Sequence, residues 1–405
     1  MGPFETWDAI GLKESVEKME KDGMTVPENI KKMLAKGAAS FYKLEKGKKM
    51  FYDFASKGYK PVRLSDTAIN LAALREEKKV VKTSSAASLI DLGDGVFCLE
   101  FHSKMNAINK TMNDFMAVAL DYVKENGIGL VVGNQTGGMP GHFSAGGDLA
   151  YMLSLARAGN FTEMEAFLKD VHAGINALRY SPFPVVSAPY GLTLGGGCEI
   201  CLASSRIVAH MDLIMGLVEI GAGLLPGACG MMNLWPKSTT AKPDVSKITD
   251  WAGFFIQAFM MVAQAKTTMS AAEARARGFL GAADRIVMNR DNLIGEARKE
   301  VIKMAEDGYA PPMKKKIAVF GREAQGMVAA EMLNMKHGGY ITPHMEFIAK
   351  KICFCMSGGD VPSGTLVAEE YLQSLERQAF IDLWKTENTQ KMAEHIMTTG
   401  KPLFL

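Results

Sequence analysis

The chain has 405 residues, of which 48% are hydrophobic and 22% charged, and its formal net charge is +2. This length exceeds the ~250–300 residues at which single cores stop growing, so we expect more than one domain. The near-neutral charge gives no electrostatic basis for binding nucleic acid, and no apolar run reaches the ~18–20 residues of a membrane span.

The cysteines and histidines give no sign of a metal site. The six cysteines lie mostly in apolar stretches, and neither they nor the seven histidines show the paired spacing of metal ligands. So few cysteines in a long chain favour reduced thiols. The first residues, MGPFETWDAIG, contain no apolar signal-peptide core. We therefore expect a cytoplasmic protein that binds neither a metal ion nor a membrane.

Residues 1–85 differ in character from the rest of the chain. The segments GLKESVEKMEKDG and PENIKKMLAKG have helical periodicity, with Gly23 and Gly37 suited to helix C-termini. The segment SFYKLEKGKKMFYDF predicts a β-hairpin around Gly47, because aromatic runs flank a Lys/Gly turn. We expect a small, mainly helical N-terminal domain.

Residues 86–312 alternate short strands with helices, which predicts an α/β domain. The predicted strands are SLIDL, VFCLEFH, LVVG, FPVVSA, RIVAH and ADRIVM. Residues 238–250 are polar and predict a loop.

Residues 313–405 are rich in Met and Leu at helical spacing, with breaks at Gly338, Pro343, Gly358 and Pro362, and predict a helical extension. The segment KKIAVFGREAQG superficially resembles a strand entering a dinucleotide-binding turn. It lacks the middle glycine that gives the pyrophosphate access to the main chain. We therefore predict no NAD site there.

The richest stretch for chemistry begins at the strand-like run 183–188, which leads to three glycines, 195–197, and then to a helix-compatible segment containing Glu199. The first amides of a helix lack intrahelical partners and carry partial positive charge, so this turn is suited to hold a developing anion. A second acid, Glu219, follows the apolar run 213–218. An unpaired acid among apolar residues has a raised pKa, which suits proton transfer near neutral pH. The alternatives are a helix-terminal carboxylate at Glu199 and a salt-bridged structural acid at Glu219.

These residues resemble a known signature. GGGCE, a glutamate twenty residues later and the pair Pro226-Gly227 resemble the active-site signature of the crotonase (enoyl-CoA hydratase/isomerase) superfamily, and FSAGGD (143–148) is similar to its F-x-A-G-x-D loop. The likeness extends from about Ser88 to Arg290. It implies the crotonase-like spiral of β-β-α units.

The resemblance also implies roles for particular residues. The amides of Gly147 and Gly196 would form an oxyanion hole, and Glu199 and Glu219 would hold a water molecule and move its protons. Substrate binding is assigned by the resemblance to Lys104, Ala145, Gly147, Asp148, Leu149 and Gly196. Lys104, in SKMNAIN, is similar to a segment that lines the CoA channel, although Ser103 replaces the family's proline and a solvated lysine is the alternative. Tyr190 and CGMMNLW depart from the family's pattern in the pocket wall, which leaves the acyl length open.

A second resemblance concerns the N-terminus. GPFETWDAIGL is similar to the last repeat of the helical C-terminal domain of NAD-dependent 3-hydroxyacyl-CoA dehydrogenases. We therefore expect the C-terminal part of a dehydrogenase/hydratase fusion, with NAD bound only by an N-terminal half that is absent from this sequence and no cofactor in this chain.

Together the resemblances imply reversible hydration of trans-2-enoyl-CoA to 3-hydroxyacyl-CoA in fatty acid β-oxidation. The partner would be an acyl-CoA thioester, and we expect a homo-oligomer. Two alternatives remain open: an enoyl-CoA isomerase, which needs only one acid at the site, and a non-catalytic docking module.

Overall fold

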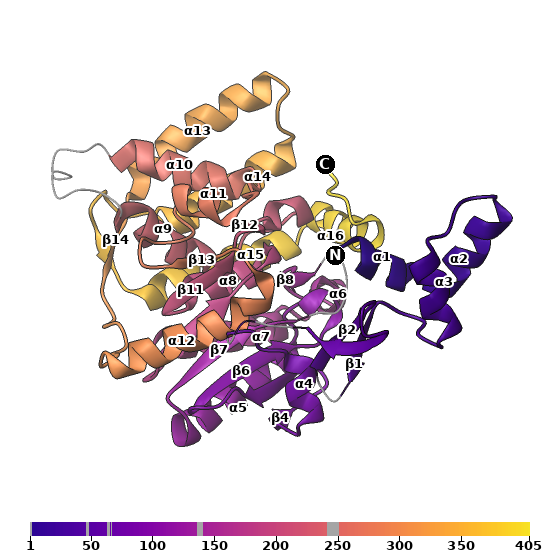
Figure 1. The fold of residues 1–405 in the computed structure, drawn as a ribbon. Helices are drawn as coiled ribbons and strands as arrows, with labels where there is room; N and C mark the ends of the chain where they lie inside the picture. The colour runs from indigo at the N-terminus through magenta and orange to yellow at the C-terminus, as the bar shows by residue number, and fades with distance from the viewer. Residues whose placement is uncertain (1, 46–47, 63–64, 66, 136–140, 241–250) are drawn as a thin grey trace.

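The computed structural model describes residues 2–45, 48–62, 65, 67–135, 141–240 and 251–405 (Figure 1). The N-terminal part is a small unit with its own core, in which Leu12, Ile30, Met33 and Phe41 are buried together. It contains α1 (Pro3–Ile10), α2 (Leu12–Lys21), α3 (Glu28–Ala35) and an antiparallel sheet of β1 (Tyr42–Glu45), β2 (Lys48–Asp53) and β3 (Gly58–Pro61). The predicted helices and hairpin are confirmed, while the hairpin turn at Gly47 falls outside the described residues.

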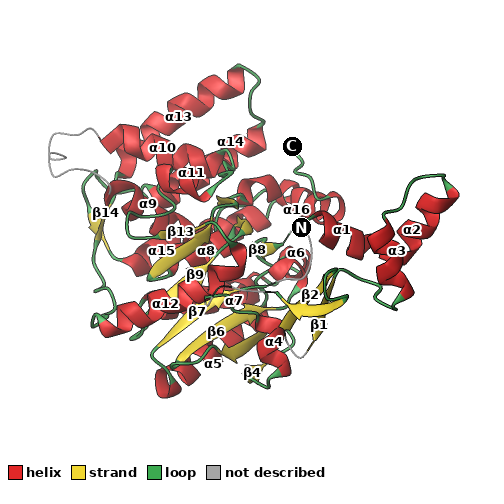
Figure 2. Cartoon of the chain, viewed as in Figure 1, coloured by secondary structure: helices red, strands yellow, loops and turns green. Residues whose placement is uncertain are grey.

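A seven-stranded sheet forms the centre of the molecule, and Figure 2 shows its strands among the helices. Its order is β13-β11-β9-β7-β6-β5-β4. The pairs from β6 to β13 are parallel, and β4, β5 and β6 pair antiparallel. The strands are β4 (Val80–Thr83), β5 (Ala87–Asp91), β6 (Val96–Phe101), β7 (Gly129–Gly133), β9 (Val185–Ala188), β11 (Arg206–His210) and β13 (Arg285–Val287).

Both faces of this sheet are covered by helices. Val131, Val186 and Val208 belong to one core with Ile294 and with other residues of α12 (Leu293–Glu306) and α4 (Leu71–Glu76). The opposite face belongs to the larger core, with α5 (Lys110–Asn126) and α7 (Phe161–Arg179). Strands buried on both faces are continuous apolar runs, which is why LVVG and its neighbours do not alternate polar with apolar residues.

A second, three-stranded parallel sheet has the order β12-β10-β8, from β8 (His142–Ser144), β10 (Gly191–Leu194) and β12 (Leu213–Gly216). The chain passes from β7 to β8, from β9 to β10 and from β11 to β12, and each time at least one helix follows before the next strand of the large sheet. This repetition is a spiral of β-β-α units, and the predicted fold is confirmed.

The strand before the triple glycine differs from the prediction. The segment 183–188 contains β9, but β9 does not lead into Gly195; the chain crosses to the small sheet and forms β10 first. Gly191, at the start of β10, has φ 54° and packs directly against the carbonyl of Gly141. A side chain at this position would be both strained and obstructed, so the glycine permits the change of sheet.

The remaining helices complete the layers. They are α6 (Leu149–Arg157), α8 (Gly196–Ala203), α9 (Gly230–Thr240), α10 (Trp251–Ala263), α11 (Ala271–Ala276), α13 (Gly321–His337), α14 (Pro343–Met356), α15 (Glu369–Trp384) and α16 (Glu387–Thr399). The 3₁₀ helices are η1 (Lys104–Asn106), η2 (Glu219–Ala222) and η4 (Arg290–Asn292). The predicted helical C-terminal extension is confirmed. The large core contains residues from Ala86 to Ala393, so these last helices share it with the strands.

Two C-terminal helices pack against earlier elements of the chain: α15 packs on α7, and α16 packs on α6 and η2. The segment KKIAVFG contains β14 (Ile317–Ala318), which pairs antiparallel with β15 (Leu366–Val367). A dinucleotide-binding turn follows a strand of a parallel sheet instead. The predicted polar loop at 238–250 is wrong for its first three residues, which belong to α9. The rest of that segment lies outside the described residues.

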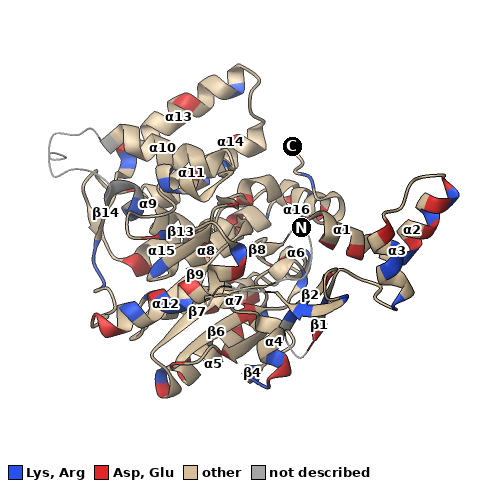
Figure 3. Cartoon of the chain, in the orientation of Figure 1, with Lys and Arg blue, Asp and Glu red and all other residues tan. Residues whose placement is uncertain are grey.

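Surface charge is mixed: in Figure 3, basic and acidic residues lie interspersed along α2, α3 and α12. None of the described helices combines the length and the apolar character needed to cross a bilayer.

Candidate active site

Three loops that follow the strands of the small sheet form the candidate site. The loop after β8 carries Gly147, the turn after β10 carries Gly196 and Glu199, and the segment after β12 carries Glu219. Because the three strands are parallel, their carboxyl ends lie at one edge of the sheet. In α/β folds, ligands bind at the carboxyl ends of parallel strands. The topology therefore brings together residues that are up to 72 positions apart in the sequence.

The triple glycine is explained by close approaches on two sides. Gly195 has φ 51°, and a Cβ on it would lie 2.9 Å from Oε1 of Glu219. A Cβ on Gly197 would lie 2.6 Å from Cβ of Ser144, so this glycine lets α8 pack directly on β8. The backbone of Gly196 itself is not in the left-handed region. The glycines thus place the start of α8 between Glu219 and the small sheet.

A cavity of about 90 Å³ contains the four residues assigned to catalysis, since Gly147, Gly196, Glu199 and Glu219 all line it. The other lining residues are mostly apolar: Ile108, Asp148, Leu149, Met152, Phe167, Leu168, Val171, Leu224, Gly227, Ala228 and Phe380. Neither the Gly147 amide nor the Gly196 amide donates to an acceptor in the described part of the chain. Both amides thus belong to residues that line the cavity and have no protein acceptor among the described residues.

Glu199 lies in the first turn of α8, with only 2% of its surface exposed. Its Oε1 accepts hydrogen bonds of 2.8 Å from the amides of Ala228 and Gly230. Burial, followed by the nearby charges of Glu219 and Glu376, raises the pKa of Glu199 well above the usual value of a carboxyl group, although the two amides oppose this shift. These bonds fix the carboxyl group in place beside the cavity.

Glu219 begins η2, and its carboxyl group is enclosed although the residue as a whole is only half-buried. Its Oε2 has no hydrogen-bond partner among the described residues. Burial raises the pKa of Glu219 to about 8. Two adjacent carboxyl groups with raised pKa values are suited to share one proton near neutral pH and to exchange it with a ligand.

The residues assigned to substrate binding are not all at the cavity. Leu149 and Asp148 line it, and Asp148 also caps α6 by accepting bonds of 3.1 Å from the amides of Ala150 and Tyr151. Ala145 is half-buried and donates its amide to the carbonyl of Met105, outside the lining. Lys104 is exposed on η1 and also lies outside the lining.

The sequence analysis missed the contribution of α15. Its residues Glu369, Gln373, Glu376 and Phe380 are all buried, and Phe380 reaches the cavity. Their spacing of four, three and four residues puts them on one face of a helix. The available signal in the sequence was a set of polar residues on the same helix face as a phenylalanine. The sequence around them does not indicate which other part of the chain this face contacts.

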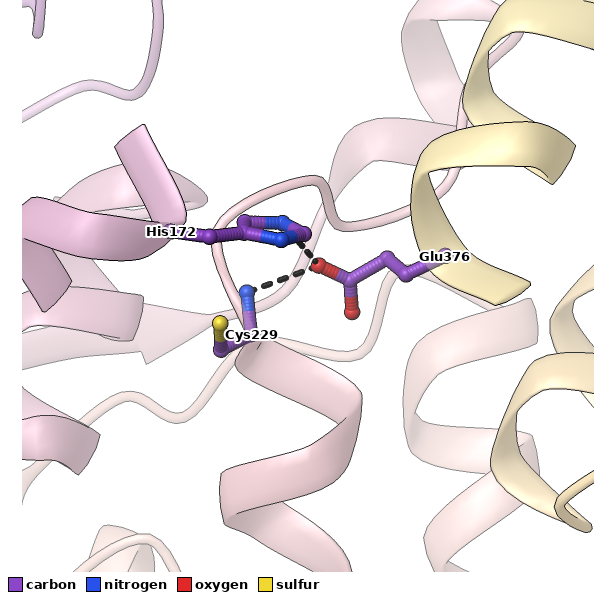
Figure 4. A group of neighbouring side chains, drawn as sticks. All are labelled: His172, Cys229 and Glu376. Carbon is purple, nitrogen blue, oxygen red and sulfur yellow. Dashed lines mark hydrogen bonds and ion pairs between the residues drawn. The ribbon is translucent and has the colours of Figure 1, made fainter. Parts of the chain in front are cut away.

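One group of described residues has the composition of a metal site: His172, Cys229 and Glu376, whose ligand atoms lie within 4.8 Å of one another. Figure 4 shows the imidazole and the carboxylate facing each other, with the Cys229 amide also directed at the carboxylate. Arg377 donates to Nδ1 of the histidine, and Gln373 donates to the cysteine sulfur. Protein donors already occupy these atoms, and the adjacent guanidinium disfavours a cation, so we interpret the group as a hydrogen-bond network.

Comparisons with known proteins agree with this architecture. The family model described as Enoyl-CoA hydratase/isomerase matches residues 92–249. The chain is 40% identical over 403 residues to the "Probable 3-hydroxyacyl-CoA dehydrogenase" of Bacillus subtilis (strain 168), covering 100% of this chain and 50% of that protein. It is 35% identical over 168 residues to the "Putative fatty acid oxidation complex trifunctional enzyme" of Rickettsia prowazekii (strain Madrid E), covering 41% of this chain and 22% of that protein. The chain thus spans half or less of the length of these curated relatives.

Two solved structures show the same fold. A carnitinyl-CoA dehydratase from Mycobacterium thermoresistibile aligns with a TM-score of 0.56 and 15% identity, covering 78% of this chain and 91% of that one. An enoyl-CoA hydratase from Bacillus halodurans aligns with a TM-score of 0.50 and 15% identity, covering 77% of this chain and 100% of that one. At this level of identity the likeness concerns the fold alone.

Proposed function

Since residues 92–249 match the enoyl-CoA hydratase/isomerase (crotonase) family, we propose that the chain catalyses the reversible hydration of trans-2-enoyl-CoA to 3-hydroxyacyl-CoA. Enzymes of this family act on acyl-CoA thioesters. The cavity supports this substrate class, because its lining is apolar except for Glu199, Glu219, Asp148 and two amides that have no acceptor among the described residues.

In the proposed reaction the amides of Gly147 and Gly196 donate hydrogen bonds to the thioester oxygen. They stabilise the negative charge that this oxygen gains as the enolate forms, and each such donor contributes roughly 3 kcal/mol. One of the two glutamates removes a proton from the water molecule while the water oxygen forms a bond to C3 of the enoyl group. The other glutamate gives its proton to C2, so one carboxyl group is protonated and the other deprotonated when the turnover ends.

The single observation that carries the proposal is the environment of the Glu219 carboxyl group. Its Oε2 is enclosed, has no hydrogen-bond partner among the described residues and belongs to a side chain that lines the same cavity as Glu199. A buried polar atom without a partner costs about 1–3 kcal/mol, which a structural acid would not retain without compensation. A water molecule held between the two carboxyl groups satisfies this atom and is the nucleophile that hydration requires.

The test uses the purified chain with trans-2-enoyl-CoA and, separately, with the 3-enoyl isomer. The proposal expects loss of the conjugated thioester and formation of 3-hydroxyacyl-CoA from the 2-enoyl substrate. Interconversion of the two enoyl isomers without hydration would favour the isomerase. Absence of turnover on either substrate would favour the docking module.

We further propose that the whole protein couples this step to NAD-dependent oxidation of the 3-hydroxyacyl product in fatty acid β-oxidation. One support is the Bacillus subtilis relative, which is named a probable 3-hydroxyacyl-CoA dehydrogenase and is about twice as long as the part that aligns with this chain. A second support is the antiparallel pairing of β14, which lies in the segment that superficially resembles a dinucleotide-binding turn. NAD would be bound outside this chain, which itself would hold no cofactor and no metal. NADH formation by this chain with 3-hydroxyacyl-CoA and NAD would contradict that division.

Two expectations from the sequence also remain proposals. The first is a homo-oligomer, which sedimentation of the purified chain would test. The second is a cytoplasmic location, supported by six buried cysteines that are all free.

A further inference from the structure

We propose that Glu376 of α15 is a positioning residue for the hydration reaction, because it holds the turn whose amides fix the Glu199 carboxyl group. This inference rests on the proposed function and assigns to the C-terminal helices a part in the chemistry. The residue lies 177 positions from Glu199 in the sequence and does not line the cavity. It would position Glu199 through the turn, and its charge also contributes to the raised pKa of Glu199.

The turn consists of three consecutive residues, Ala228, Cys229 and Gly230, whose amides are divided between two carboxylates. The outer amides each donate a 2.8 Å bond to Oε1 of Glu199. The middle amide, from Cys229, donates a 2.8 Å bond to Oε1 of Glu376. Each peptide group is rigid and planar and is joined to the next at a shared Cα atom. An acceptor that fixes the Cys229 amide therefore also restricts the directions of the Ala228 and Gly230 amides.

The turn has a strained backbone and packs directly against the Glu199 carboxylate. Cys229 has φ 66°, in the left-handed region that costs a non-glycine residue roughly 1 kcal/mol or more, so a partner must hold it there. On the other side, a Cβ on Gly230 would lie 2.7 Å from Oε1 of Glu199, so the main chain lies directly against the carboxylate. Movement of the turn therefore changes the position of the Glu199 oxygen as well.

Glu376 is itself held by His172 of α7. The Nε2 atom lies 3.0 Å from the carbonyl oxygen of Gly227 and 3.1 Å from Oε1 of Glu376, and since both are acceptors in this arrangement, Nε2 carries the proton. Nδ1 lies 3.0 Å from the guanidinium of Arg377, which can only donate. The imidazole links the residue before the turn to the carboxylate that holds the turn (Figure 4).

The experiment compares Glu376→Met with Glu376→Gln in the full chain. Methionine removes the acceptor at similar size, while glutamine keeps an oxygen that can accept from Cys229. We expect Glu376→Met to lose roughly 10- to 100-fold in kcat for enoyl-CoA hydration with KM changed less than about 3-fold, because a small misplacement of a reacting group has effects of that order. Glu376→Gln should keep kcat within about 3-fold of the wild type.

Glu369→Met is the matched control. Glu369 is a buried carboxylate on the same helix, 5% exposed, and it accepts a 2.6 Å bond from the hydroxyl of Tyr180 and pairs with Arg179. Its loss should lower the melting temperature as much as Glu376→Met does, yet leave kcat unchanged. Equal kcat losses in the two methionine variants, or an unchanged kcat in Glu376→Met, would overturn the proposal. If Glu376→Met does not fold, Glu376→Asp, which withdraws the acceptor by one methylene, takes its place with the same expected loss.

Hydrogen exchange at the three turn amides tests the positioning role of Glu376 without relying on hydratase activity. In Glu376→Met the amides of Ala228 and Gly230 should exchange faster along with that of Cys229, whereas in Glu369→Met all three should keep their wild-type protection. Unchanged protection of Ala228 and Gly230 in Glu376→Met would show that Glu376 does not position them. A wild-type chain that hydrates no enoyl-CoA would refute the proposed function, while the exchange result would still decide whether Glu376 fixes the turn.

Discussion

The hydroxyl of Thr389 in α16 donates a 2.8 Å hydrogen bond to the carbonyl of Gly223, the residue that ends η2 after Glu219. Thr389 is fully buried, and Nε2 of His344 lies 3.1 Å from the same hydroxyl oxygen. The segment that carries Glu219 is therefore held by α16, as the turn beside Glu199 is held by α15. Both acids of the candidate site depend on helices that follow them in the chain by more than 150 residues.

Replacement of Thr389 by valine tests this relationship. Valine has nearly the same shape but leaves the carbonyl of Gly223 and the imidazole of His344 without their partner, so the free energy of unfolding should fall by about 1–3 kcal/mol. Thr398→Val is the control, because that hydroxyl is exposed on the same helix and bonds only to carbonyls of its own turn. Chemical denaturation of both variants measures the difference, and equal stability losses would show that the buried hydrogen bond is unimportant.

The pKa of Glu219 predicts how stability depends on pH. Its folded-state pKa is raised from 4.5 to about 8, so its contribution is fully present below pH 4.5 and is lost as the pH rises to about 8. Glu219→Gln removes this loss. The free energy of unfolding of the variant, relative to that of the wild type, should therefore increase from about pH 5 and level off above about pH 8, at about 1.4 kcal/mol for each unit of pKa shift. Chemical denaturation at a series of pH values measures this difference.

Glu346→Gln is a control of opposite sign. Lys350 and Lys336 lower the pKa of Glu346 to about 2, so its contribution is present above pH 4.5 and is lost as the pH falls toward 2. This variant should be less stable than the wild type at pH 7 and approach it in acid. A pH-independent difference for Glu219→Gln would mean that its carboxyl group titrates normally.

Two glycines of the site should respond differently to alanine. A Cβ on Gly197 would meet Cβ of Ser144 at 2.6 Å and its carbonyl oxygen at 2.9 Å, so α8 must move away from β8. We expect Gly197→Ala to lose about 1–3 kcal/mol of stability through overpacking. A Cβ on Gly147 meets nothing within 4 Å, so Gly147→Ala should change stability by less than about 0.5 kcal/mol. Thermal unfolding of the two variants gives the comparison, and a stable Gly197→Ala would contradict the packing described here.

Phe380 should influence which acyl chains the cavity accepts. It lines the cavity, and a Cβ on Gly227 would lie 2.8 Å from its ring. Phe380→Leu enlarges the space, so the ratio of kcat/KM for longer over shorter enoyl-CoA substrates should rise by about 10-fold, the order expected for a methylene-sized change in an apolar pocket. Phe255→Leu, at a fully buried residue outside the lining, should leave this ratio unchanged. An unaltered ratio in Phe380→Leu would show that α15 does not contribute to acyl-chain selection.

The residues that could be predicted from the sequence are those whose chemistry is local. Gly195, Gly196 and Glu199 lie within five positions, and the turn and the helix that contain them follow from that short stretch. The change of sheet at Gly191 was missed, because the apolar pattern of β9 and β10 does not reveal which sheet each strand joins. Glu376 and Thr389 were missed for a similar reason: a helical pattern shows that a face is buried but not which distant segment it contacts.

The most direct test of the two-acid site is hydration of a short trans-2-enoyl-CoA by the wild type, Glu199→Gln and Glu219→Gln, after circular dichroism has confirmed that all three are folded. Glutamine keeps the shape of each side chain and removes its ability to transfer a proton, which is typically worth ~10²–10⁴-fold. The account predicts hydration by the wild type and a loss in kcat of at least about 10²-fold in each variant. Wild-type kcat in either variant would contradict the requirement for both carboxyl groups.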